Sequence, residues 1–102
     1  MYSLEVTASA EADLDQIADY LGTVLANPPA ALALLDEIER ISDTLEATPE
    51  IFPLCSDYRL AKLGYRKAVA RAYILVYEID YNVQTVRILR LFHSSENYPN
   101  KL

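Results

Sequence analysis

The chain has 102 residues, a length typical of one domain and too short for two, so we expect a single domain over residues 1–102. Hydrophobic residues make up 52% and charged residues 24% of it, with two glycines and five prolines, which excludes a collagen-like or disordered chain. The net charge of −6 argues against a uniformly basic nucleic-acid-binding protein.

That charge is unevenly distributed along the chain. Residues 1–58 hold twelve acids and one base, a net −11, whereas residues 59–102 hold eight bases and three acids, a net +5. The C-terminal part can therefore bind an anion, and the N-terminal part repels one. No apolar run is long enough to span a bilayer and no signal-peptide pattern is present, so we expect a cytoplasmic protein with no membrane partner.

The chain has one cysteine and one histidine, Cys55 and His93. A single cysteine excludes an internal disulfide, and a single histidine excludes a two-histidine zinc site. We therefore expect no metal and no cofactor, and we interpret Cys55 as a small, half-buried apolar residue.

Apolar and polar residues alternate over residues 2–7, which predicts a short, half-buried strand. Either Thr7 or Ser9 can cap the helix that follows. Apolar residues then recur at steps of three and four, so the first helix is expected from about Ala10 to Leu25.

Asn27 followed by two prolines predicts the start of a second helix, which ends at Thr48-Pro49. The two helices form a hairpin with acidic outer faces, which we interpret as a soluble exterior; a basic partner is the alternative. Residues 50–64 are expected to be irregular. Strands are expected at residues 65–69, 71–79 and 85–92, with a turn at 80–84 and a polar tail at 94–102.

This order predicts an α+β fold: an N-terminal strand and an antiparallel helical hairpin packed on one face of a mostly antiparallel sheet, completed by three C-terminal strands. We expect the other face to be open. Since the C-terminal strands carry arginine, lysine and tyrosine, that face is a plausible platform for phosphates and bases.

Two ordered sets of segments stand out: residues 59–69, 73–79 and 86–93, followed by Asn97-Tyr98, and residues 12–21, 27–28 and 45–49. The first set resembles the sheet half, and the second the helical hairpin, of the RelE/ParE toxins of type II toxin–antitoxin systems, so the resemblance covers essentially the whole chain. The resemblance implies a RelE-like fold. It also implies a cognate antitoxin, expected to lay a segment with acids and large apolar residues over the basic sheet or along the hairpin.

The resemblance implies two different activities. RelE-like members cut mRNA in the ribosome, whereas ParE-like members bind and poison DNA gyrase without cutting anything. Our first hypothesis is a ribosome-dependent, metal-independent mRNA endoribonuclease; the alternatives are a gyrase inhibitor and a degenerate toxin that binds only its antitoxin. Alone, the chain is expected to be a monomer or dimer, and with antitoxin a hetero-oligomer.

Metal-free RNA cleavage requires a group that takes a proton, a group that gives one, and cations that stabilise the phosphorane. The resemblance places an acid/base near the chain end, at His93 and Tyr98, and an arginine at Arg66. The predicted RNA contacts are Lys67, Arg71, Arg59, Lys62, Arg90 and Tyr65.

The sequence departs from the family pattern at two places. Ile74 stands where many members have arginine, and the usually basic stretch after His93 is Ser94-Ser95-Glu96. Alternatively, His93 simply ends a strand and bonds to the backbone.

Other expectations concern which face each side chain occupies. Tyr73 and Tyr77 are expected in the core. Residue alternation places Arg66 and Lys67 on opposite faces of their strand, unless a bulge intervenes. It does the same for Arg87 and Arg90, one of which is expected to pair with an acid such as Glu78.

Overall fold

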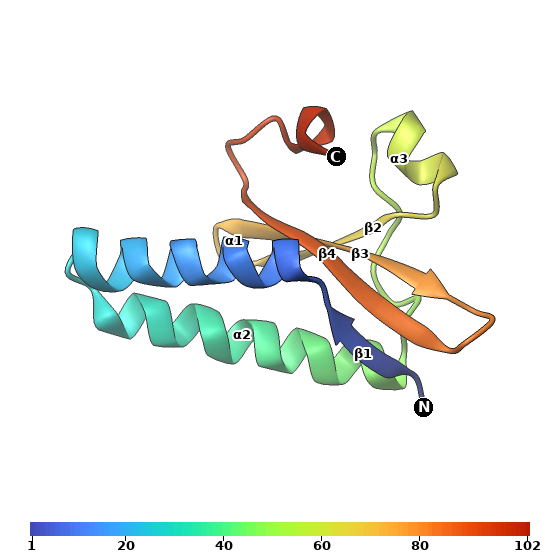
Figure 1. Ribbon diagram of the computed structural model, residues 1–102, viewed down its shortest axis with the longest axis horizontal. Helices are drawn as coiled ribbons and strands as arrows, with labels where there is room; N and C mark the ends of the chain where they lie inside the picture. The colour runs from blue at the N-terminus through green and yellow to red at the C-terminus, as the bar shows by residue number, and fades with distance from the viewer.

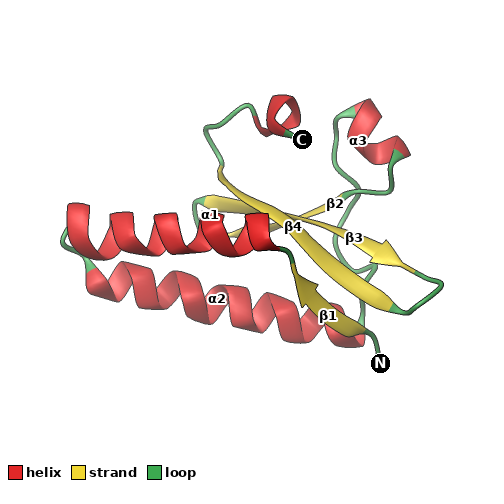
Figure 2. Ribbon diagram, viewed as in Figure 1, coloured by secondary structure: helices red, strands yellow, loops and turns green.

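The computed structural model describes all 102 residues and contains a four-stranded sheet with helices on both sides. Figure 1 shows the long helices on one side and a short helix with the C-terminal segment on the other, and Figure 2 marks the element types. The elements are β1 (Ser3–Val6), α1 (Ala8–Asp19), η1 (Tyr20–Val24), α2 (Pro28–Ala47), α3 (Tyr58–Lys62), β2 (Arg66–Ala70), β3 (Tyr73–Asp80), β4 (Thr85–His93) and η2 (Tyr98–Lys101).

The predicted α+β fold is confirmed. The strand order is β1-β4-β3-β2, with β1 parallel to β4 and the other neighbours antiparallel. Each strand lies within two residues of its predicted position. The turn between β2 and β3 falls at Arg71 and Ala72, where Arg71 takes a positive φ of 56°. No helix combines the length and apolarity needed to cross a membrane.

The helical hairpin begins and turns where side-chain caps allow it. The Thr7 hydroxyl accepts the Ala10 N–H at 3.2 Å, and the Asn27 side chain accepts the Ala30 N–H at 3.2 Å, so both caps satisfy otherwise free helix donors. The end of the first helix differs from the prediction, because residues 20–24 form a π-helical turn closed by a 2.9 Å bond from Leu25 N–H to the Tyr20 carbonyl.

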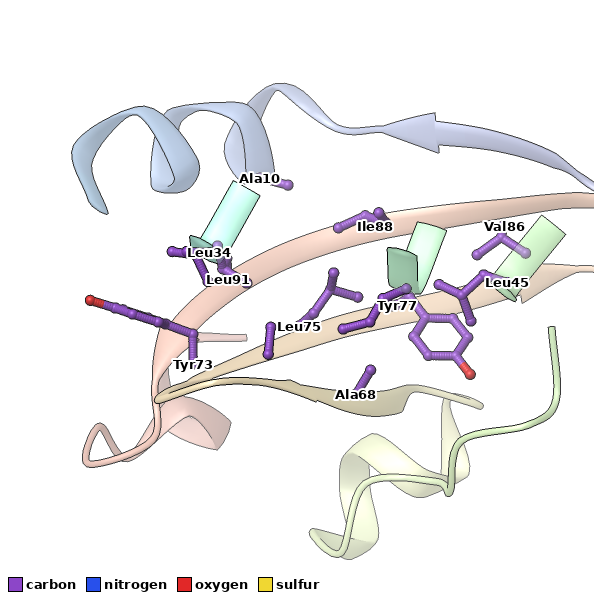
Figure 3. Close-up of a cluster of buried hydrophobic side chains, with 12 residues drawn as sticks. Ala10, Leu34, Leu45, Ala68, Tyr73, Leu75, Tyr77, Val86, Ile88 and Leu91 are labelled. Atoms are coloured by element: carbon purple, nitrogen blue, oxygen red, sulfur yellow. The ribbon is translucent and has the colours of Figure 1, made fainter. Parts of the chain in front are cut away.

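The main core lies between the hairpin and the sheet. Figure 3 shows it, with Leu34 and Leu91 near Tyr73 at one end and Tyr77 nearer the other. Tyr77 is fully buried, and its hydroxyl donates to the Pro49 carbonyl at 2.8 Å. The prediction that Tyr73 and Tyr77 belong to the core is therefore confirmed.

The opposite face of the sheet is covered, so the prediction of an open face is wrong. A second buried cluster there consists of Cys55, Leu60, Val76, Phe92 and Tyr98. Leu60 comes from α3, inside the segment expected to be irregular, and Tyr98 comes from the C-terminal segment. A five-residue helix is too short to show helical periodicity in a sequence, which is why it was not predicted.

A bulge in β4 changes which residues share a face. Arg87 pairs with Glu78 and Arg90 pairs with Val76, and the register shifts between Val76 and Tyr77 so that Leu89 is the additional residue. Because Glu78 and Val76 lie two apart on one strand, Arg87 and Arg90 share a face, and the prediction of opposite faces is wrong. The expected pairing with Glu78 is confirmed: Arg87 lies 3.7 Å from it.

Candidate functional site

His93 ends β4 at one corner of the sheet, on the hairpin side. Its ring is edge-on to Tyr73, with centroids 5.3 Å apart. The Ser95 backbone N–H donates to Nδ1 at 3.1 Å, and Ser95 Oγ lies 2.7 Å from the same atom. Since Nδ1 accepts a hydrogen bond from the Ser95 N–H, the neutral ring carries its own proton on Nε2.

Tyr98 lies on the other face of the sheet. Its ring stacks on Phe92 with centroids 5.8 Å apart, and it is 8% exposed beside Cys55. Burial raises the pKa of the Tyr98 hydroxyl and of the Cys55 thiol. His93 shares the hairpin side with Tyr73, so the structure does not bring the two predicted proton-transfer residues together.

Arg66 lies at the opposite end of the sheet from His93. It pairs with Tyr77 on β3, whereas His93 pairs with Tyr73, four residues away along that strand. With about 3.3 Å per residue and 4.8 Å per strand, the two backbones lie roughly 16 Å apart. The Arg66 guanidinium donates to the Phe52 carbonyl at 2.7 Å, so it holds a loop in place.

Most of the other cations also have partners within the chain. Arg90 binds Asp13 through two hydrogen bonds of 2.7 and 3.1 Å and packs on the Phe92 ring. Arg59 donates to the Pro99 carbonyl at 2.6 Å, and Lys62 lies 5.4 Å from the centre of the Tyr58 ring.

Two cations of the C-terminal half remain without such a partner. Lys67 and Arg71 make no side-chain hydrogen bond, ion pair or ring contact in the structure. Lys67 is paired with Val76 and lies on the face of the sheet that α3 covers. Arg71 lies in the turn between β2 and β3, at the end of the sheet nearest the hairpin tip. The positive charge is therefore distributed over the molecule, and the expected single basic platform is absent.

Two hollows flank His93. A polar pocket of about 190 Å³ lies beside α1 and contains the Asp13–Arg90 pair. A larger groove of about 540 Å³ lies between the tip of the hairpin and the end of the sheet; its floor is mostly apolar and its rim includes Arg71 and His93. We call the second the hairpin-tip groove. No group of three or more histidine, cysteine or carboxylate side chains is placed to hold a metal ion.

Sequence reasoning missed the hairpin-tip groove. Its floor residues from the hairpin, Tyr20, Leu21, Leu25 and Leu34, read as ordinary members of two helical stripes. Nothing in their spacing shows that the hairpin extends past the sheet, or that Tyr20 and Leu25 remain exposed while Leu34 is buried. Arg71 and Ala72 were predicted inside a strand, so the sequence did not place them in the turn at this end of the sheet.

Comparison with known proteins gives a consistent result. Residues 4–98 match the family model for the ParE toxin of type II toxin–antitoxin systems. A chain of the chromosomal ParDE system from P. aeruginosa is 25% identical, with a TM-score of 0.70, covering 91% of this chain and 96% of that one. A chain of the RelBE2 toxin–antitoxin complex from Mycobacterium tuberculosis is 26% identical, with a TM-score of 0.61, covering 90% and 96%. The curated protein sequences gave no match.

Proposed function

Because the chain belongs to the ParE toxin family of type II toxin–antitoxin systems, we propose that it acts by binding and inhibiting DNA gyrase, without cutting RNA. A cognate antitoxin is its natural partner, since its structural relatives come from toxin–antitoxin complexes. Gyrase is the target that the ParE side of the resemblance implies.

One observation supports this choice over RNA cleavage: the three predicted catalytic residues are not assembled into a site. His93 and Tyr98 lie on opposite faces of the sheet, and Arg66 lies at the far end of it. Acid–base catalysis requires both proton-transfer groups within hydrogen-bond reach of the reacting atoms, about 3 Å away. Inhibition by binding requires no such constellation.

The chemistry of the individual groups supports the same choice. Burial raises the pKa of Tyr98, which makes its hydroxyl a weaker acid than an exposed tyrosine. Arg66 donates to the Glu50 and Phe52 carbonyls, so contact with a phosphate would require it to leave them. Such a change would break both hydrogen bonds, one of them to a part-buried carbonyl.

The test compares both activities of the purified chain. Relaxed plasmid, gyrase and ATP are incubated with the chain, and mRNA from a translating extract is mapped by primer extension. We expect supercoiling to fall and new mRNA ends to be absent, and addition of the antitoxin to restore supercoiling. Unaffected gyrase would disprove the proposal.

New mRNA ends would instead support the nuclease hypothesis. In that case the variants His93→Ala, Tyr98→Phe and Arg66→Ala test the predicted catalytic roles, since each should abolish the cleavage pattern. If neither gyrase nor mRNA is affected while the antitoxin still binds, the chain is a degenerate toxin and the gyrase proposal fails.

A further inference from the structure

The outer face of α2 combines acids with exposed leucines. Five exposed residues recur there at steps of three and four, so they form one stripe that points away from the core: Leu32, Leu35, Asp36, Glu39 and Asp43. We call them the α2 stripe. Leu32 is 62% and Leu35 37% exposed. An acidic face with exposed leucines suits a basic partner that has an apolar surface of its own.

The short helix α3 has the complementary character. Tyr58 is 76% and Leu63 56% exposed, and together with Arg59 and Lys62 they line an open hollow of about 600 Å³. We call these four residues the α3 surface. The Lys62 ammonium lies 5.4 Å from the centre of the Tyr58 ring and has no carboxylate partner. The neighbouring acid, Asp57, is occupied as the cap of the helix.

The two helices belong to parts of the chain with opposite charge. Residues 58–77 hold five bases and no acid, whereas residues 28–47 hold five acids and one base. Arg59 is occupied by the carbonyls of Pro99 and Leu102, so Lys62 is the cation of the α3 surface that is free to bind a carboxylate. The α2 stripe offers carboxylates and leucines together, which match the free lysine and the apolar lining of the hollow.

A single molecule cannot make this contact. Figure 1 shows α2 on one side of the sheet and α3 on the other, and each packs on its own buried cluster. Two molecules can bring the stripe of one against the α3 surface of the other. Because the contact joins two different surfaces, it leaves one of each free at the ends, and further copies can add head to tail.

The alternative ligand for a basic surface, a nucleic acid, fits less well here. Binding to a phosphate backbone requires several cations that contact successive phosphates. The α3 surface offers one free lysine between Tyr58 and Leu63, and Arg66 donates to loop carbonyls. A partner with one carboxylate next to a large apolar side chain matches this surface better.

The net charge of −6 on each molecule opposes association at long range. At physiological ionic strength, charges more than about 8 Å apart are largely screened. A carboxylate and an ammonium in contact lie within about 4 Å, so their attraction is screened less than the repulsion between whole molecules. We therefore expect a weak contact that forms at high micromolar concentrations.

From these observations we propose that free chains associate head to tail, with the α2 stripe of one molecule on the α3 surface of the next. Leu32 enters the hollow beside Tyr58 and Leu63. Asp36, one helical turn further along α2, binds Lys62 of the neighbouring molecule. The contact requires neither gyrase nor antitoxin, so it is independent of the function proposed above.

Sedimentation equilibrium of the purified chain, before and after nuclease treatment, measures its average molar mass from about 10 to about 500 μM. Two variants each block one surface: Leu32→Glu blocks the α2 stripe, and Lys62→Glu blocks the α3 surface. Val83→Glu and Arg71→Glu are the matched controls, since each makes the same change of charge at an exposed residue outside both surfaces. Circular dichroism melts compare the folding of all chains.

We expect the mass of the unmodified chain and of both controls to rise with concentration above the 11.5 kDa of the monomer, and each blocked variant to stay at that value. An equimolar mixture of Leu32→Glu and Lys62→Glu should rise again, but to no more than twice the monomer mass. In that mixture the intact α3 surface of the first variant binds the intact stripe of the second, and both remaining ends are blocked. This recovery would also show that both variants are folded.

A constant monomer mass for the unmodified chain would overturn the proposal. Association of either blocked variant to the same extent as the unmodified chain would also overturn it. A mixture that stays monomeric would indicate that two identical surfaces meet, which the head-to-tail contact does not allow. Association that is lost after nuclease treatment would assign the α3 surface to a nucleic acid instead.

Discussion

At the scale of single residues, the Asp13 carboxylate connects the first helix to the sheet. β1 pairs with β4 only as far as Ile88, so the Leu91 N–H beyond it has no strand partner. The Asp13 carboxylate accepts that N–H at 2.9 Å and binds the Arg90 guanidinium at 2.7 and 3.1 Å. Asp13 thus fastens α1 to the open edge of β4.

Asp13→Asn should lower the free energy of unfolding by about 2–3 kcal/mol, because the half-buried Arg90 loses its counter-charge while remaining desolvated. Urea denaturation followed by far-UV circular dichroism measures it. Asp15→Asn, two residues away and exposed, is the matched control and should change stability by less than about 0.5 kcal/mol. Equal stability of the two variants would contradict this role for Asp13.

Tyr77 should make stability depend on alkaline pH. Burial raises its pKa to about 12, whereas an unfolded tyrosine ionises near pH 10. Because the folded chain holds this proton more tightly, the stabilisation is complete below pH 10 and is lost as the pH rises towards 12.

Tyr77→Phe removes both the ionisable group and its bond to the Pro49 carbonyl. At pH 7 the variant should be less stable by about 1 kcal/mol, and between pH 9 and 12 it should lose roughly 2 kcal/mol less than the unmodified chain. Urea midpoints across this range measure the difference. Tyr58 is 76% exposed, so Tyr58→Phe should keep the original pH slope; a shared slope for all three chains would refute the assignment.

At the scale of elements, α3 and the C-terminal segment act together as a cover for the second face of the sheet. Leu60 of α3 is fully buried, and Arg59 of the same helix donates to the Pro99 carbonyl. Tyr98 completes the cover by stacking on Phe92. Cys55 lies beneath it and is 3% exposed.

Removing the Tyr98 ring should uncover Cys55. In Tyr98→Ala, the rate of thiol modification by a disulfide reagent should rise at least about tenfold, because the void lets the segment open locally. Tyr98→Phe keeps the stacked ring and should react almost as slowly as the unmodified chain. If Tyr98→Ala reacts no faster, the segment does not protect this face.

At the scale of the whole molecule, the acidic side chains gather on the helical hairpin, whereas the basic side chains are spread over both faces of the sheet. The acidic hairpin lies on one side of the sheet. Arg59 and Lys62 belong to α3 on the other side, and Lys67, which is paired with Val76, faces that other side too. Arg71 and His93 are the donors at the end where the hairpin projects. The hairpin side of the molecule is therefore acidic, and no single face gathers the basic side chains.

The amino-acid sequence by itself determined the two long helices and the four strands, the Asn27 cap, and the family; for the first helix it left the cap open between Thr7 and Ser9. These depend on local periodicity, capping chemistry and ordered motifs, which a linear chain displays directly. The cover over the second face, the bulge at Leu89 and the hairpin-tip groove were decided only by tertiary structure. They depend on contacts between residues far apart in the chain, such as Asp13 and Arg90, which are separated by 77 residues. Local sequence patterns do not indicate such contacts.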